Sequence, residues 1–281
     1  MIILKNEHLT VGVNPFGAEL SSIVDNTGRE YVWQGDPTVW NGRAPILFPI
    51  TGRLLSDSYT YNDTTYYLQK HGFARKSAFA IFSEDDDHAT FTLSSTEDTK
   101  RVYPFDFLLT ADYRLSGKTL TVTNTVNNMG SSDMYFSFGA HPAFNIEIGD
   151  RVEFSETETF IAHLFNELSL IDGTKLIAEN TNSITITEHI FDGDAIFFEN
   201  LKSTSATVVS EKDGALLKMT YGKAPLLGLW AKPGAPYVCI EPWHGICDHP
   251  NVSGKIEEKP HIIKLGVGEK QVFSYTIEIL R

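Results

Sequence analysis

The chain has 281 residues, of which 42% are hydrophobic and 21% charged, as in an ordinary globular protein. Its formal net charge of −13 argues against a nucleic-acid or anionic-membrane partner, because such partners attract a basic surface. The two cysteines, Cys239 and Cys247, form no CxxC motif, which excludes a disulfide scaffold and favours a reducing compartment. No signal-peptide pattern opens the chain, and no apolar run approaches the roughly 18 residues of a membrane helix. We therefore expect a cytoplasmic protein whose oligomeric state stays open.

Strand signals recur along the chain between turn residues. Residues 21–34 hold two β-rich pieces around an Asp-Asn-Thr-Gly turn, and residues 58–73 repeat the pattern around Asn62-Asp63. Apolar and polar residues alternate over 108–126, 206–222 and 271–280, with turns at Ser116-Gly117 and Asp213-Gly214. Turns spaced by about 8–12 residues, with a period of two between them, predict an all-β sandwich or barrel with few short helices. No linker, low-complexity tract or repeat divides the chain, so residues 1–281 are predicted to form a single domain.

Several widespread catalytic motifs are absent from the sequence. There is no GxxxxGK[ST] phosphate loop, no GxGxxG after a strand, no HExxH and no GxSxG. These absences argue against nucleotide transfer, dinucleotide redox chemistry, and the common zinc-protease and serine-esterase designs. They are consistent with a reaction that needs no cofactor.

One candidate strand, "MYFSFGAH" at residues 134–141, ends in a histidine. Because side chains alternate along a strand, Tyr135, Ser137, Gly139 and, if the strand continues, His141 share a small polar face. Such a face could be the floor of a cleft. The structural alternative is an outward-facing strand that ends at a His-Pro turn.

A second strand, "YVCIEPW" at residues 237–243, carries a carboxylate between aromatic rings. Tyr237, Cys239, Glu241 and Trp243 share one face of it. Aromatic rings stack on the apolar C–H face of a sugar while a charged group meets its hydroxyls, so this pattern favours sugar binding. The alternative is an edge strand with Glu241 in water.

Two further segments hold polar residues beside apolar ones. In "QKHGFAR", strand alternation would put His71 on one face and Lys70 on the other, and Gly72 permits a tight bend or close backbone approach. The apolar run at residues 44–54 stops at Gly52-Arg53. A core histidine and a capping arginine are the structural alternatives.

These residues carry a resemblance to a known family. Arg53 after "ILFPITG", His71 in "KHGFAR", His141 in "GAHPAFN" and Glu241 in "YVCIEPW" stand in the order seen in aldose 1-epimerases. Over essentially its whole length, the chain resembles the LacX-type bacterial branch of the galactose-mutarotase-like superfamily.

The resemblance implies a β-supersandwich whose concave face binds one sugar, with no cofactor and no metal. Glu241 matches the family's general base and His141 its general acid, and we expect each to stabilise the charged form of the other. An acidic residue that binds hydroxyls is expected at Asp194 or, less favoured, Asp192. The residues expected to bind the sugar are Arg53, His71, Arg75, Asp194, Trp230, Tyr237 and Trp243.

Other functions remain open from the sequence. Free-galactose enzymes tend to have His-Gly-Gly where this chain has "HGFAR", so Arg75 is an extra cation close to His71. With Arg53, Lys70 or Arg43 it could bind a 6-phosphate, because guanidinium suits phosphate, and a hexose 6-phosphate is therefore an alternative substrate. A carbohydrate-binding protein without turnover is a second alternative. A glycoside hydrolase using Glu241 and Asp194 is a third. A metal site built from His71, His141 and either His244 or His249 has no support from residue spacing.

Overall fold

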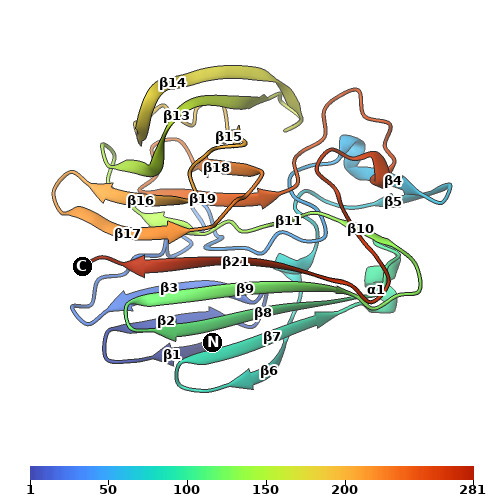
Figure 1. The fold of residues 1–281 in the computed structure, drawn as a ribbon, viewed down its shortest axis with the longest axis horizontal. Coiled ribbons are helices and arrows are strands. Elements are labelled where there is room, and N and C mark those ends of the chain that lie inside the picture. Colours follow the sequence, from blue (N-terminus) through green and yellow to red (C-terminus); the bar gives the residue numbers. More distant parts are fainter.

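Antiparallel strands form nearly all of the regular secondary structure in the computed structural model, which describes residues 1–281 (Figure 1). The all-β prediction is confirmed. Helical structure is limited to α1 (Glu97–Lys100) and three short 3-10 turns, η1 (Leu55–Asp57), η2 (Ala74–Lys76) and η3 (Ile256–Glu258). The strands are β1 (Ile2–Lys5), β2 (Leu9–Asn14), β3 (Glu19–Asp25), β4 (Ser58–Tyr61), β5 (Thr64–Tyr67), β6 (Ala80–Glu84), β7 (His88–Ser94), β8 (Phe107–Ser116), β9 (Thr119–Asn128), β10 (Met134–Phe136), β11 (Phe138–Gly139), β12 (Ala143–Asn145), β13 (Arg151–Phe165), β14 (Ile171–Thr185), β15 (Ile196–Glu199), β16 (Ser205–Ser210), β17 (Gly214–Thr220), β18 (Leu226–Trp230), β19 (Tyr237–His244), β20 (Ile263–Leu265) and β21 (Lys270–Ile279).

One 14-stranded sheet organises the molecule. Its path runs β11-β19-β18-β15-β13-β16-β17-β21-β9-β8-β7-β6, with β12 paired to β19 and β14 paired to β13. The three-stranded sheet β1-β2-β3 and the pairs β4-β5 and β10-β20 complete the fold. In Figure 1, the half of the large sheet that contains β18 and β19 lies above β21, and the half that contains β7 to β9 lies below it.

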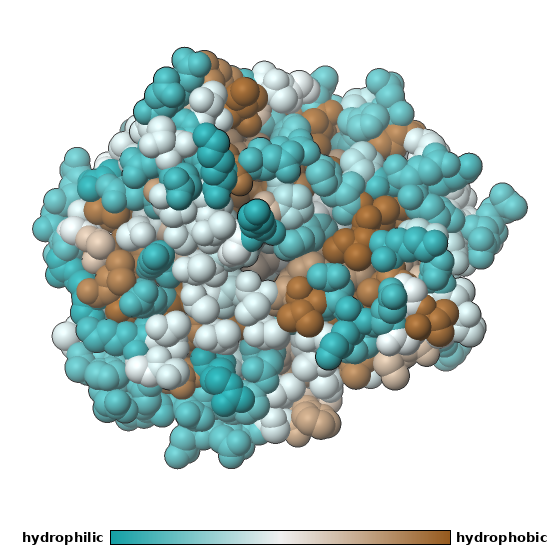
Figure 2. Space-filling model, viewed as in Figure 1, coloured by the Kyte–Doolittle hydropathy of each residue, from teal (hydrophilic) through white to brown (hydrophobic).

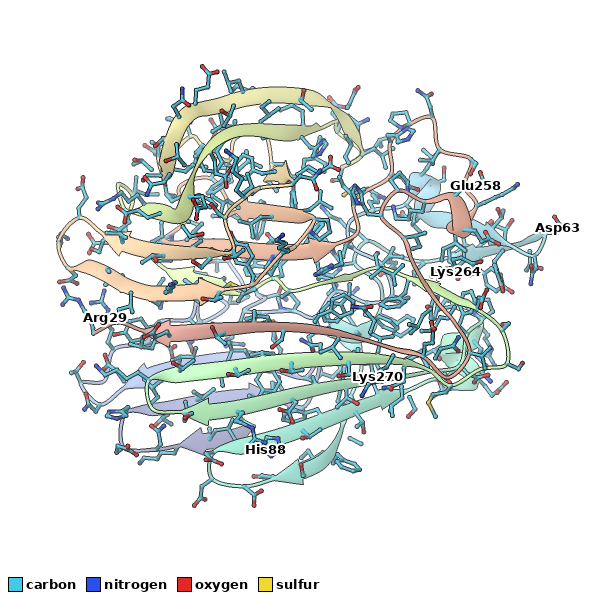
Figure 3. The ribbon with its side chains drawn as sticks, viewed as in Figure 1. Arg29, Asp63, His88, Glu258, Lys264 and Lys270 are labelled. Atoms are coloured by element: carbon cyan, nitrogen blue, oxygen red, sulfur yellow. The ribbon has the colours of Figure 1, made fainter.

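Most of the predicted hairpins are confirmed. Asn62 and Asp63, both with positive φ, join β4 to β5, and a two-residue turn of this kind matches the twist of the flanking strands. Asp63 lies at the outer tip of that hairpin (Figure 3). The pairs β8-β9 and β16-β17, and strand β21, also match the prediction. The second β-rich piece of residues 21–34 is different, because after β3 the chain makes only isolated bridges at Glu30 and Val32.

The burial of the strands explains the period-two pattern and identifies the centre of the fold. Strands β8 and β9 bury alternate residues, as strands with one covered face do. Strand β19 differs, because all but its last residue are buried, so both of its faces are covered. A single hydrophobic cluster of 69 buried residues extends from β1 to β21, which makes the chain one domain.

The surface is largely hydrophilic on the face shown in Figure 2, where hydrophobic residues appear as small separate groups rather than a broad patch. None of the helices has the length and apolar character needed to span a membrane.

Candidate active site

A cavity of about 260 Å³ lies beside β18 and β19. This volume is slightly below the roughly 300–1,000 Å³ of sites for drug-sized ligands, so it suits one small molecule. Seven of the nine predicted site residues line it: His71, Arg75, His141, Asp194, Trp230, Glu241 and Trp243. Lys70, considered from the sequence only as a partner of Arg75 for a phosphate, also lines it. The sequence did not single out the remaining lining residues as sugar-binding: Trp40, Pro45, Phe165, Ala195, Phe197, Lys232 and Cys247.

The pairing of three strands brings His141 and Glu241 together. On β19, Trp243 lies opposite Gly139 of β11, and Cys239 lies opposite Ala143 of β12. Position 141 therefore falls opposite position 241, although the strand is interrupted there. Facing residues of antiparallel strands have Cβ atoms about 4.5–5.5 Å apart, which places the two side chains within contact.

The contact between these two side chains is close but does not form an aligned hydrogen bond. His141 Nε2 and Glu241 Oε2 lie 3.2 Å apart, with side-chain exposures of 10% and 1%. Glu241 Oε2 nevertheless has no hydrogen-bond partner, and neither has His141 Nδ1 or Trp243 Nε1. Buried polar atoms are almost always hydrogen-bonded, so three such atoms at one cavity indicate groups kept available for a ligand.

Burial changes the proton affinities of the pair in the direction opposite to our expectation. It raises the pKa of Glu241 well above 4.5 and lowers the pKa of His141 to about 3. The expected mutual stabilisation of the charged forms is therefore wrong. Removal from water penalises both charges more than their proximity favours them.

His71 is fixed at the cavity by a left-handed turn rather than by a strand. His71 and Gly72 have φ of 68° and 66°, and a Cβ on Gly72 would lie 2.3 Å from the carbonyl oxygen of Phe48. The predicted close approach at Gly72 is confirmed. The turn also brings both Lys70 and His71 to the cavity, so the expectation that they face opposite sides is wrong.

The hydrogen bonds of His71 set its tautomer. Its Nδ1 accepts from the backbone N–H of Gly52 at 3.1 Å, and the backbone N–H of His71 donates to the Gly52 carbonyl at 2.8 Å. Burial, followed by the charge of Lys70, lowers the pKa of His71 well below 6.5. A neutral ring whose Nδ1 accepts must carry its proton on Nε2, so His71 offers an N–H donor.

Tryptophan rings form much of the cavity wall. The ring of Trp40 stacks on His141 with centroids 5.2 Å apart, and Trp230 meets the same imidazole edge-on at 5.6 Å. Trp243 lies edge-on to His71 at 5.5 Å. Trp40 comes from a segment without regular strands, where no periodic pattern marks a residue as inward-facing.

Arg53 and Tyr237 do not line the cavity, contrary to the prediction. The guanidinium of Arg53 donates to both carboxylate oxygens of Asp57, at 2.9 and 2.8 Å. Tyr237 is fully buried behind the wall, with its ring stacked on Trp40 at 5.5 Å and its hydroxyl accepting from the Lys232 N–H. Each side chain thus has a structural partner in place of a cavity position.

Of the two candidate acids, Asp194 and Asp192, only Asp194 lines the cavity. Asp194 lines the cavity, where its φ of 79° turns the chain just before β15 and its Oδ1 accepts from the Ala195 N–H at 2.9 Å. Asp192 does not line it, and its exposed carboxylate contacts His189 at 3.0 Å. Asp194, the preferred candidate, is therefore the acid at the cavity.

Three cations also line the cavity, in a protein whose net charge is negative. Lys70, Arg75 and Lys232 lie there, and none of them forms a salt bridge within the chain. The Arg75 guanidinium donates to the Lys70 carbonyl at 2.9 Å, whereas its Nε has no partner. Burial lowers the pKa of Arg75. Unpaired cations around a cavity favour a ligand with a negative group.

The histidine metal site considered from the sequence is not assembled. His244 packs its ring on Phe273 at 4.7 Å, and His249 Nδ1 accepts from the Asn251 N–H. The one cluster of possible metal ligands contains His141, Cys239 and Glu241 instead.

Comparison with known proteins agrees with the fold. The family model for aldose 1-epimerase matches residues 1–277. Protein LacX of Lactococcus lactis subsp. lactis is 36% identical, covering 99% of this chain and 99% of its own.

Solved structures of similar proteins have the same fold. A galactose mutarotase related enzyme from Lactobacillus acidophilus superposes with a TM-score of 0.94 at 30% identity, covering 99% of this chain and 97% of that one. A galactose mutarotase-like protein from Lactobacillus casei ATCC 334 gives 0.93 at 29% identity, covering 99% of both chains. The predicted resemblance is confirmed, and with it the isomerase class. The chain belongs to the aldose 1-epimerase family.

Proposed function

We propose that this protein interconverts the α and β anomers of a hexose, with Glu241 and His141 as its acid–base pair. One observation carries the proposal: two buried ionisable groups meet at 3.2 Å beside a cavity, and the carboxylate oxygen has no hydrogen-bond partner. A structural pair would have that oxygen satisfied. Strongly shifted pKa values in a cavity are typical of functional groups.

The reaction explains why one carboxylate and one imidazole are needed. Glu241 removes the proton of the hydroxyl on carbon 1 while His141 protonates the ring oxygen. The bond between carbon 1 and the ring oxygen breaks, which gives an open-chain aldehyde. Rotation about the bond between carbons 1 and 2 then exposes the other face of the carbonyl to ring closure. General acid and base groups of this kind each contribute roughly 10²–10⁴-fold to the rate.

The shifted proton affinities are compatible with these roles. A protonated Glu241 beside a neutral His141 holds one proton, and so does a Glu241 carboxylate beside an imidazolium. The two forms differ only in where that proton lies. Burial favours the uncharged form. The charge of Lys70 lowers the pKa of both groups, which favours the Glu241 carboxylate and disfavours the His141 imidazolium. Because the reaction runs in both directions, ring closure uses the two groups in exchanged roles.

The remaining cavity residues suit the rest of a sugar. The rings of Trp40, Trp230 and Trp243 can stack on apolar C–H faces. The Nε2–H of His71 can donate to a sugar oxygen, and the carboxylate of Asp194 can accept from a hydroxyl.

The test is the decay of optical rotation of freshly dissolved α-galactose and α-glucose, with and without the protein. Acceleration above the spontaneous rate supports the proposal. Sugar binding without acceleration, seen by calorimetry on the same samples, would instead support a carbohydrate-binding protein that lacks turnover.

A second candidate substrate, a hexose 6-phosphate, is favoured by the three unpaired cations. Arg75 and Lys70 are partly buried at the cavity, where a phosphate would be better bound than at the open surface. NMR exchange between the anomers of glucose 6-phosphate tests this candidate. Acceleration of the phosphorylated sugar at concentrations where the free sugar does not react would select it.

A further inference from the structure

Cys239 is a buried thiol beside the acid–base pair that the proposed reaction does not use. It lies two residues before Glu241 on β19, so both side chains point to the same face of the strand. Its partner in the ladder is Ala143, the small residue two positions after His141. A ligand nitrogen of His141, the Cys239 sulfur and a Glu241 oxygen all lie within 4.8 Å of one another.

We propose that His141, Cys239 and Glu241 form a site for a thiophilic divalent cation such as Zn²⁺, which would bind between the acid–base pair and the Cys239 sulfur. Imidazole, thiolate and carboxylate are the three ligand types that Zn²⁺ binds in proteins. Three protein ligands leave a fourth position, which would open to the cavity for water or a ligand oxygen.

The separations fit such an ion with small movements. Tetrahedral Zn²⁺ with bonds of about 2.0–2.2 Å to nitrogen and oxygen requires those atoms to lie roughly 3.4 Å apart. His141 Nε2 and Glu241 Oε2 are 3.2 Å apart now, without an aligned hydrogen bond to break. With a bond of about 2.3 Å to sulfur, the sulfur would lie roughly 3.6 Å from each of the other two ligand atoms. The sulfur now lies at most 4.8 Å from each of these atoms. It must therefore approach each of them by no more than about 1.2 Å.

Binding of the ion would release protons and block the acid–base pair. The ion replaces the thiol proton and any proton held by the pair, and these protons leave to solvent. An ion coordinated by His141 and Glu241 prevents both from exchanging protons with a sugar. Reversible inhibition by Zn²⁺ therefore rests on the proposed function, whereas binding of the ion does not.

Titration of the reduced, metal-free full-length protein with Co²⁺ tests the site without any sugar. Co²⁺ takes up zinc sites, and a cobalt–thiolate bond gives a charge-transfer absorption in the near ultraviolet. We expect this band to saturate at one ion per chain and to disappear when Zn²⁺ is added. Mg²⁺, which prefers oxygen ligands, should not compete.

The two cysteines provide matched variants. Cys247 lines the cavity but is outside the cluster, whereas Cys239 belongs to the cluster and is not among the cavity-lining residues. Cys247→Ala should therefore keep the band and Cys239→Ala should lose it. Because the chain has no third cysteine, the Cys247→Ala result assigns the thiolate even if Cys239→Ala does not fold. No band in the wild type, or a band that Cys247→Ala removes, would overturn the proposal.

Inhibition is measured separately. Zn²⁺ should slow anomer exchange, and a chelator should restore it. Cys239→Ala should raise the half-inhibiting Zn²⁺ concentration by at least about tenfold, as loss of a ligand requires. Absence of turnover together with an intact cobalt band would contradict the proposed function and leave the metal site standing. Inhibition of Cys239→Ala at the wild-type Zn²⁺ concentration would contradict the site.

Discussion

His88 and Asp112 meet on the partly exposed face of β7 and β8, whereas His141 and Glu241 meet at the cavity (Figure 3 labels His88). In the first pair, His88 Nε2 lies 2.5 Å from Asp112 Oδ2, and the hydroxyl of Thr90 donates to the same oxygen at 2.8 Å. In the second pair the nitrogen–oxygen distance is longer, and the carboxylate oxygen has no hydrogen-bond partner.

A short distance between a histidine and a carboxylate does not by itself make the pair reactive. Asp112 is 30% exposed and its oxygen is satisfied by neighbours, so it has little reason to bind anything else. Glu241 is 1% exposed and its oxygen is free, which is costly unless a ligand supplies the missing hydrogen bond. The unsatisfied buried atom, more than the short distance, distinguishes a candidate catalytic pair from a structural one.

The largest effect is expected from neutralising each of the two carboxyl groups in turn. Glu241→Gln should lower the rate of anomer exchange by roughly 10²–10⁴-fold, because an amide cannot accept the hydroxyl proton. Asp112→Asn, the matched change at the other pair, should leave the rate unchanged. Optical rotation measures both, and circular dichroism checks the fold. An active Glu241→Gln variant would remove Glu241 from the reaction.

His141→Asn tests whether the histidine acts together with Glu241. It should lose activity to a similar extent, and the double variant with Glu241→Gln should be hardly worse than either single variant, because groups that act as a unit are not additive. Losses that multiply would mean that the two side chains act independently.

Strand reasoning could predict much of the site, because β19 is a regular strand. Alternation placed Glu241 and Trp243 on one face, and both line the cavity. Alternation failed at Lys70 and His71, because the positive φ angles of His71 and Gly72 form a turn in place of a strand. It also gave no information on Trp40, which comes from a segment without strand pairing.

The electrostatics of the site could not be predicted from the sequence. A glutamate and a histidine placed side by side suggest an ion pair, and in water they would form one. How far each group is removed from water depends on the tryptophan wall and on both covered faces of β19, which only the folded chain defines. For the same reason, the partner that holds Arg53, Asp57, was not anticipated.

A smaller effect is expected from the cations. Arg75→Met should raise the KM for glucose 6-phosphate by about tenfold, the equivalent of about 1.4 kcal/mol, if the guanidinium binds phosphate. The KM for free glucose should not change. Arg53→Met is the matched control, because Arg53 is paired with Asp57 outside the cavity. Equal losses on both sugars would contradict a phosphate role for Arg75 and indicate a structural one.

Glu241 should also make the stability of the fold depend on pH. Burial holds the pKa of Glu241 well above 4.5, so above that pH the folded chain keeps a proton that the unfolded chain has lost. The free energy of unfolding therefore falls as pH rises through this range, by at most about 1.4 kcal/mol per pH unit for one proton.

The folded Glu241→Gln variant cannot keep this proton, because glutamine has no carboxyl group. Urea unfolding from pH 5 to pH 8 should show the variant gaining stability relative to wild type as pH rises. A difference between Glu241→Gln and wild type that stays constant over this range would mean that the carboxyl is ionised in the folded protein.

The smallest effect is expected at the other histidine. His88→Gln replaces one side of a partly exposed contact, and exposed ion pairs contribute only about 0.2–1 kcal/mol. The urea midpoint should therefore shift slightly, and the rate of anomer exchange should remain at the wild-type value. A large loss of turnover in this variant, with the fold intact, would show that a satisfied surface pair can control the cavity. The unsatisfied oxygen of Glu241 would then no longer suffice to identify the reactive pair.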